Sequence, residues 1–132
     1  MALLVPNNGE VDALKYFLNV SGPENLVLRL FTSDTTPSET DTADTYTEAS
    51  GYGYSAIALV AANWVVIEGN PTVATHPLQT FTFTGGLGFV YGYYLTRASS
   101  GRLAYAERFS DGPYPVVNNG DQVKVTLTVN VD

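Results

Sequence analysis

The chain has 132 residues, which suits one compact domain and leaves no room for a second catalytic lobe. Six Lys and Arg residues stand against 13 Asp and Glu residues, so the net charge of −7 has the wrong sign for holding a nucleic-acid backbone. The absence of cysteine excludes thiolate catalysis, Cys-ligated zinc, iron–sulfur clusters and disulfide bonds. We therefore expect a single domain, residues 1–132, with no nucleic-acid partner.

Residues 1–8 form an N-terminal arm that precedes any regular element. Its apolar residues, Leu3, Leu4 and Val5, are able to dock on the chain's own core or on a neighbouring chain. The arm carries no basic residue, and its apolar run is too short for a signal peptide. No later stretch approaches the length of a membrane span, so we expect a soluble chain, made inside a cell, with no membrane partner.

Residues 10–19 are predicted to form one short amphipathic helix. Asn8 is a candidate N-cap, and the Ser-Gly-Pro triplet at 21–23 is expected to end the helix near Val20. The apolar residues at helical spacing are Val11, Leu14, Phe17 and Leu18.

A long acidic loop, residues 33–54, follows a predicted buried strand at 26–32. Thr36 and Glu39 flank Pro37 in the pattern of a capping box, which predicts a brief helical turn inside the loop. No Lys or Arg lies between Arg29 and Arg97, so calcium binding is one interpretation of the loop. The order of acidic residues in an EF-hand is absent, and we favour a solvated acidic loop without a metal.

The remaining chain reads as short strands separated by Gly- and Pro-rich turns. The turn at 98–101 predicts an antiparallel hairpin, and strict alternation predicts a final strand with one buried face. Together with one short N-terminal helix, about seven strands predict a mainly β fold, an antiparallel β-sandwich or an open barrel. Besides the strand at 26–32, the predicted strands lie at 55–60, 63–68, 80–84, 89–97, 102–109, 114–117 and 122–131.

Candidate catalytic residues are scarce. His76 is the single histidine, and because it precedes Pro77 we interpret it as a polar loop residue. No serine sits in a Gly-x-Ser-x-Gly elbow or beside an obvious base. We expect no enzyme, no cofactor and no metal, although paired carboxylates for glycoside hydrolysis are set by geometry that a sequence does not show.

Tyrosine is unusually frequent, with nine copies. This residue is favoured where one end of a side chain is buried and the other meets water, as at a protein interface or a sugar-stacking platform. Cross-strand pairing on the predicted hairpin is the simpler alternative for several of them. The tyrosines that we select as candidate partner contacts are Tyr52, Tyr54, Tyr91 and Tyr93.

Several segments together resemble small structural proteins of tailed bacteriophages: MALLVPNNGE at 1–10, LFTSDTTPSE at 30–39, YAERF at 105–109, DGP at 111–113 and NNGD at 118–121. The resemblance extends along most of the chain and includes no catalytic motif. It implies a virion component that binds the major capsid protein or other virion proteins. It also implies a homo-oligomer, with a trimer favoured, because decoration proteins of this kind are small, β-rich and trimeric.

Three functions follow from these expectations. The first is a capsid decoration or cement protein, located in the virion, that stabilises the shell by bridging capsid subunits. The second is a tail, baseplate or fibre-associated module. The third, from a different class, is a carbohydrate-binding module that uses Trp64 or the tyrosines as its platform. The expected partner contacts are Leu3, Leu4, Val5, Tyr52, Tyr54, Tyr91 and Tyr93.

Overall fold

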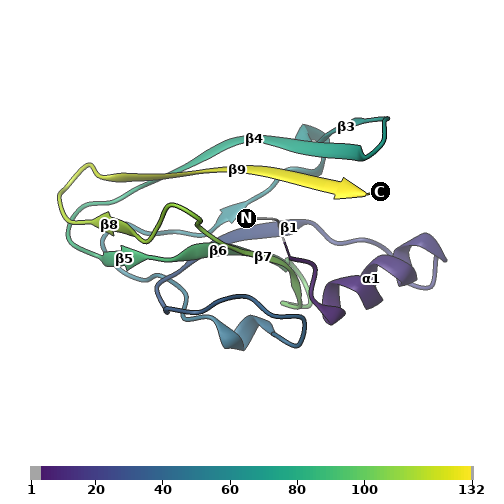
Figure 1. Ribbon diagram of the computed structural model, residues 1–132, viewed down its shortest axis with the longest axis horizontal. Helices are drawn as coiled ribbons and strands as arrows, with labels where there is room; N and C mark the ends of the chain where they lie inside the picture. The colour runs from purple at the N-terminus through teal and green to yellow at the C-terminus, as the bar shows by residue number, and fades with distance from the viewer. Residues whose placement is uncertain (1–3, 132) are drawn as a thin grey trace.

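The computed structural model describes residues 4–131 and confirms a mainly β fold with one N-terminal α-helix (Figure 1). Within these residues the strands form three antiparallel sheets. There are nine strands, more than expected, partly because the predicted strand at 89–97 divides at Tyr91. The elements are α1 (Asn7–Phe17), β1 (Leu26–Phe31), η1 (Ala43–Thr45), β2 (Ile57–Ala58), η2 (Ala61–Asn63), β3 (Val65–Ile67), β4 (Thr72–Thr82), β5 (Gly88–Val90), β6 (Gly92–Arg97), β7 (Leu103–Arg108), β8 (Tyr114–Val116) and β9 (Gln122–Val131).

Two of the sheets face each other and enclose the main core (Figure 1). One has the strand order β2-β1-β6-β7 and the other β3-β4-β9, while β5 and β8 form a separate pair. The main core combines Phe83, which follows β4, with buried residues of both sheets: Leu28, Leu30, Leu95, Phe81, Val123, Val125 and Leu127.

The predicted hairpin and the last strand are confirmed. Strands β6 and β7 pair antiparallel around the turn at 98–101. In β9, Val123, Val125 and Leu127 point into the core while the residues between them are exposed, as the alternation requires. The alternation ends before the strand does, because Val131 is exposed.

Strand β4 corrects the interpretation of His76. The residue lies inside this strand and is almost fully buried, not in a polar loop. The pairing of β4 with β9 shifts between His76 and Gln79, which is a β-bulge. Pro77 sits in that bulge, where a missing N–H breaks no ladder bond, so a proline does not end the strand here.

The helix begins and ends earlier than predicted. Pro6, not Asn8, occupies the N-cap, and the carbonyl of Pro6 accepts the first helical bond from Glu10. At the other end Asn19 adopts φ 57°, and the N–H of Val20 donates to the carbonyl of Lys15. This is a Schellman motif with Asn19 in the left-handed position, so the helix stops before the Ser-Gly-Pro triplet.

The acidic loop is more ordered than a solvated loop would be. Its helical turn is η1, capped reciprocally by Thr42 and Thr45, and not the predicted turn at 36–39. The N–H of Asn7 in α1 donates to the carbonyl of Glu39, which ties the loop to the start of the helix. The loop runs along the sheet that contains β1 and β6, on the side away from the other sheet (Figure 1).

The predicted strands at 55–60 and 63–68 are shorter in the structure. They contract to β2 and β3, and η2 lies between them. Strand β3 is the edge of its sheet, and all three of its residues, Val65, Val66 and Ile67, are exposed.

Candidate functional site

The N-terminal arm docks on its own chain. Leu4 forms a β-bridge with Ala106 of β7, in which the N–H of each residue donates to the carbonyl of the other at 2.9 and 3.0 Å. Leu4 and Val5 are half-buried and Pro6 is buried. Of the two alternatives for the arm, the structure shows docking on the chain's own sheet, and the third predicted contact, Leu3, lies outside the described residues.

Tyr52 and Tyr54 occupy different environments although they are close in sequence. Tyr52 is exposed, has φ 53°, and accepts a backbone bond from Thr84. Tyr54 is half-buried, and its hydroxyl donates to Glu48 at 2.8 Å and accepts from the N–H of Leu30. Tyr54 therefore links the acidic loop to β1, while Tyr52 is available to a partner.

Tyr91 and Tyr93 belong to two different clusters. Tyr93 lies in the core between the sheets, where its hydroxyl donates to Glu107 and where burial raises its pKa. Tyr91 packs on the second, smaller cluster, and the guanidinium of Arg108 lies 5.2 Å above its ring. The four predicted tyrosines therefore do not form one contact surface.

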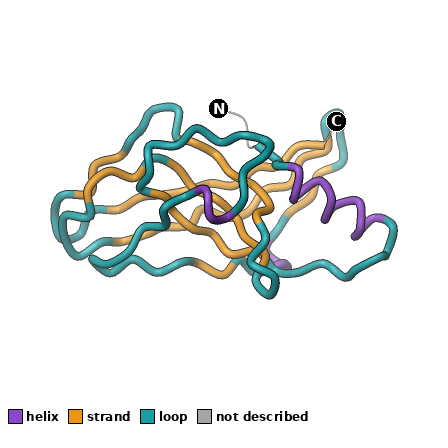
Figure 2. The backbone as a smooth tube through the Cα atoms, turned by 90° about the horizontal axis from the view of Figure 1, so that it is seen from below, coloured by secondary structure: helices purple, strands orange, loops and turns teal. Residues whose placement is uncertain are grey.

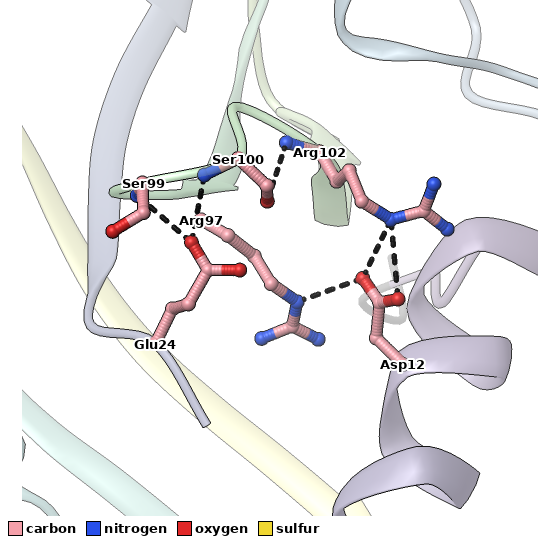
Figure 3. Close-up of polar contacts among 6 residues, drawn as sticks. All are labelled: Asp12, Glu24, Arg97, Ser99, Ser100 and Arg102. Atoms are coloured by element: carbon pink, nitrogen blue, oxygen red, sulfur yellow. Dashed lines mark hydrogen bonds and ion pairs between the residues drawn. The ribbon is translucent and has the colours of Figure 1, made fainter. Parts of the chain in front are cut away.

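Helix α1 is attached to the sheet by ion pairs of the buried Asp12 with the buried Arg97 and the partly exposed Arg102 (Figure 3). The Asp12 carboxylate accepts hydrogen bonds from Nε of Arg97 at 2.9 Å and from Nε of Arg102 at 3.0 Å. Burial raises the pKa of Asp12, but the hydrogen bonds from Arg102 and Arg97 outweigh it and hold the pKa below its usual value. The Arg97 guanidinium also lies 4.7 Å from the centre of the Tyr16 ring.

A second carboxylate fixes the hairpin that supplies these arginines. Glu24 accepts the backbone N–H groups of Ser99 and Ser100 at 2.8 and 2.7 Å (Figure 3). These bonds, the Ser100 bond foremost, lower the pKa of Glu24. The turn between β6 and β7 is thereby held in place beside α1.

The apolar side of α1 faces away from the protein. The helix turns Gly9 and Asp12 toward the sheet, and Phe17 is 84% exposed. Figure 2 shows α1 extending past most of the strands at one end of the molecule. An amphipathic helix normally buries its apolar stripe, so this arrangement leaves a contact surface uncovered. We call it the α1 apolar surface, formed by Val11, Leu14, Phe17, Leu18 and Val20.

A polar cavity of 350 Å³ lies between the acidic loop and the sheet that carries β1 and β6. Arg29 donates from Nε to the hydroxyl of Thr96 and from Nη1 to both oxygens of Glu48, all at 3.0 Å. Tyr94 forms part of the wall, and its ring stacks on that of Tyr46 with centroids 5.1 Å apart. No local sequence pattern predicts this cavity, because its residues come from four separate segments of the chain.

His76 is buried, and among residues 4–131 its ring has hydrogen-bond contacts only with Pro77 and Gln79. Its Nδ1 lies 3.1 Å from the carbonyl of Pro77, and its ring meets the edge of Trp64 at 5.0 Å between centroids. Nε2 has no hydrogen-bond partner among residues 4–131. Trp64 is half-buried and packs against the main core.

Three acidic residues of the loop pair with neighbours instead of converging on one point. Asp34 forms an ion pair with Arg108, and Glu48 pairs with Arg29. Asp41 accepts from the hydroxyl of Tyr46 at 2.7 Å. Among residues 4–131, no three His, Cys, Asp or Glu side chains lie close enough together to hold a metal ion.

Comparison with known proteins yields no relative: no protein family, curated protein or solved structure matches the chain. The structure has three helices in residues 4–131, namely α1, η1 and η2. None of them is long and apolar enough to cross a bilayer.

Proposed function

We propose that the chain is a non-enzymatic structural protein of a bacteriophage particle that docks on other virion proteins through the α1 apolar surface. The exposure of this surface carries the proposal, together with the resemblance of the sequence to small phage structural proteins. Burying a large apolar side chain that water otherwise contacts contributes about 1.5–3 kcal/mol. Several such side chains on one short helix are enough to anchor a partner.

The attachment of α1 supports this role. Asp12, Arg97 and Arg102 hold the helix from its polar side, so its apolar side stays free for a partner without loosening the helix. The major capsid protein is the proposed partner, and the chain then acts as a decoration or cement protein. Three copies in a trimer would engage the shell together, and the linked attachments would bind more tightly than one.

A variant that replaces apolar residues of the α1 apolar surface by serine, and leaves the core residues unchanged, tests this proposal. The variant Leu14→Ser/Phe17→Ser/Leu18→Ser changes side chains that are more than half exposed, so the fold is expected to remain intact. We expect it to lose binding to the particle in co-sedimentation. The matched control is Val117→Ser, which changes an equally exposed apolar residue away from α1.

Cryo-electron microscopy of the particle tests the location. Density of this fold across the capsid lattice supports a cement role, and density confined to the tail supports the tail, baseplate or fibre alternative. Unchanged particle binding by the triple variant would reject the α1 apolar surface as the contact. Absence of the protein from the particle would reject the virion role altogether.

A further inference from the structure

The polar cavity beside β1 has the composition of a ligand site. Its walls come from the acidic loop, from β1 and β6, and from the turn after β6. Its volume of 350 Å³ falls at the lower end of the range of pockets that bind small molecules. Its lining residues are Arg29, Ala43, Asp44, Tyr46, Glu48, Tyr94, Thr96 and Gly101.

Arg29 is held rigidly and keeps donors to spare. Its Nε and Nη1 are fixed by Thr96 and Glu48, and the Glu48 carboxylate is fixed in turn by the Tyr54 hydroxyl. The Nη2 group forms no hydrogen bond with any residue from 4 to 131, although a guanidinium carries five N–H donors. A positioned donor group therefore remains for a ligand.

Tyr94 supplies a second polar group to the wall of the cavity. The residue is only 4% exposed, yet its hydroxyl has no hydrogen-bond partner among the described residues. Tyr94 lines the cavity together with Arg29, Asp44 and Glu48. Among residues 4–131 this hydroxyl is not one of the fully buried polar atoms that lack a partner, so solvent reaches it and it is available to a ligand in the cavity.

The charged residues that line the cavity indicate which class of ligand it binds. Two carboxylates, Asp44 and Glu48, stand against one guanidinium, so the wall carries one excess negative charge that repels phosphate, sulfate and carboxylate groups. Asp44 is exposed and forms no hydrogen bond or ion pair with residues 4–131, which leaves an acceptor for a hydroxyl donor. Fixed donors beside free acceptors match vicinal hydroxyl groups, each of which donates and accepts.

We propose that this cavity binds the hydroxyl groups of a neutral saccharide. The Nη2 group of Arg29 and the hydroxyl of Tyr94 donate to the sugar, and Asp44 accepts from it. The rings of Tyr46 and Tyr94 are buried, so recognition rests on the polar edge of one sugar unit and not on ring stacking. This site is separate from the α1 apolar surface, so either proposal stands if the other fails.

The test is a titration of the ¹⁵N-labelled full chain followed by NMR. The probes are methyl glycosides of glucose, galactose and mannose, with sodium phosphate and sodium acetate as the anion arm. We expect at least one glycoside to shift the Arg29 Nε signal and the backbone signals of Asp44 and Thr96, while the anions leave them unchanged. A glycan array distinguishes a free sugar from the end of a glycan chain.

Two variants test the named groups. Tyr94→Phe removes one hydroxyl, and we expect it to weaken glycoside binding roughly two- to tenfold, the value of one hydrogen bond. Asp44→Ala alters an exposed side chain, keeps the fold and is expected to weaken binding similarly. The matched control, Tyr52→Phe, removes the same atom from an exposed tyrosine outside the cavity and leaves affinity unchanged.

Three outcomes would overturn the proposal: no shift with any glycoside and no binding on the array, saturation by phosphate or acetate in place of the glycosides, or equal affinity of Tyr94→Phe, Asp44→Ala and the unaltered chain.

Discussion

Asp12 of α1 lies 2.9 Å from Nε of Arg97 in β6, and both side chains are more than nine-tenths buried. These two residues are far apart in the chain, and their ion pair connects the helix to the four-stranded sheet that contains β6. The same carboxylate also binds Arg102, so a single acidic residue neutralises two cations. Helix α1 is thus attached through its polar side, which explains how its apolar side remains exposed.

Removal of this carboxylate tests the attachment. Asp12→Ala leaves Arg97 buried without its partner, and the loss of one member of a buried pair costs about 3–5 kcal/mol. We expect urea denaturation to show a lower free energy of unfolding by that amount and hydrogen exchange to show faster exchange in α1. The control Glu10→Ala changes an exposed acidic residue of the same helix, with an expected effect within about 0.5 kcal/mol. Equal stability of the two variants would contradict the assigned role of Asp12.

The helix also shows what periodicity predicts and what it leaves open. The spacing of Val11, Leu14 and Phe17 predicts a helix in this segment, and the structure has one. Periodicity does not predict which side turns inward, because that depends on Arg97 and Arg102, more than eighty residues away. Local sequence therefore predicts the element but not its packing.

The same limit applies to the sites. The hairpin of β6 and β7 and the alternation of β9 depend on neighbouring residues, and the sequence predicts both. The cavity depends on Arg29 meeting Thr96, 67 positions later in the chain, and no local pattern encodes that meeting. The sequence does not predict the burial of His76 for a related reason, since the bulge that accommodates Pro77 forms only where β4 pairs with β9.

Close packing at Gly9 is required for α1 to dock. A Cβ at this position would overlap the carbonyl oxygen of Ala104 in β7 and press on the Val5 side chain. We expect Gly9→Ala to lower the free energy of unfolding by about 1–3 kcal/mol, as overpacking usually does. Gly22→Ala is the control, because a Cβ there meets no atom within 4 Å. If both alanine variants unfold at the same urea concentration, the helix does not need this close approach.

Replacement by alanine should lower the stability of the protein much more at Phe31 than at Phe17. Phe31 is fully buried against Tyr46 and Tyr94, so Phe31→Ala is expected to cost about 3–5 kcal/mol. Phe17 is 84% exposed, so Phe17→Ala should change stability by less than about 0.5 kcal/mol. Thermal and urea unfolding of both variants measure the difference. A large loss of stability in Phe17→Ala would mean that the α1 apolar surface packs within the chain.

Two tyrosines with raised pKa values, the buried Tyr94 and the half-buried Tyr114, make the fold sensitive to alkali. Burial foremost raises the pKa of Tyr94 to about 12, with the charge of Glu48 adding to it and that of Arg29 opposing it. Burial and a hydrogen bond to Asp111 raise the pKa of Tyr114 to about 12. An unfolded tyrosine titrates near pH 10, so the unfolded chain loses these protons first. The stabilisation from these two residues is therefore complete below about pH 10 and is lost as the pH rises toward 12.

Tyrosinate absorbance and circular dichroism measured on the same samples test this dependence. In the native protein we expect part of the tyrosinate signal to emerge only as the fold is lost, above about pH 10. The chain unfolded in urea should titrate in one step near pH 10, because its tyrosines are all hydrated. Tyr94→Phe removes one of the two groups whose pKa is raised. The free energy of unfolding of this variant should therefore fall less steeply between pH 10 and pH 12. A native chain that titrates every tyrosine near pH 10 without losing structure would show that Tyr94 and Tyr114 are open to water.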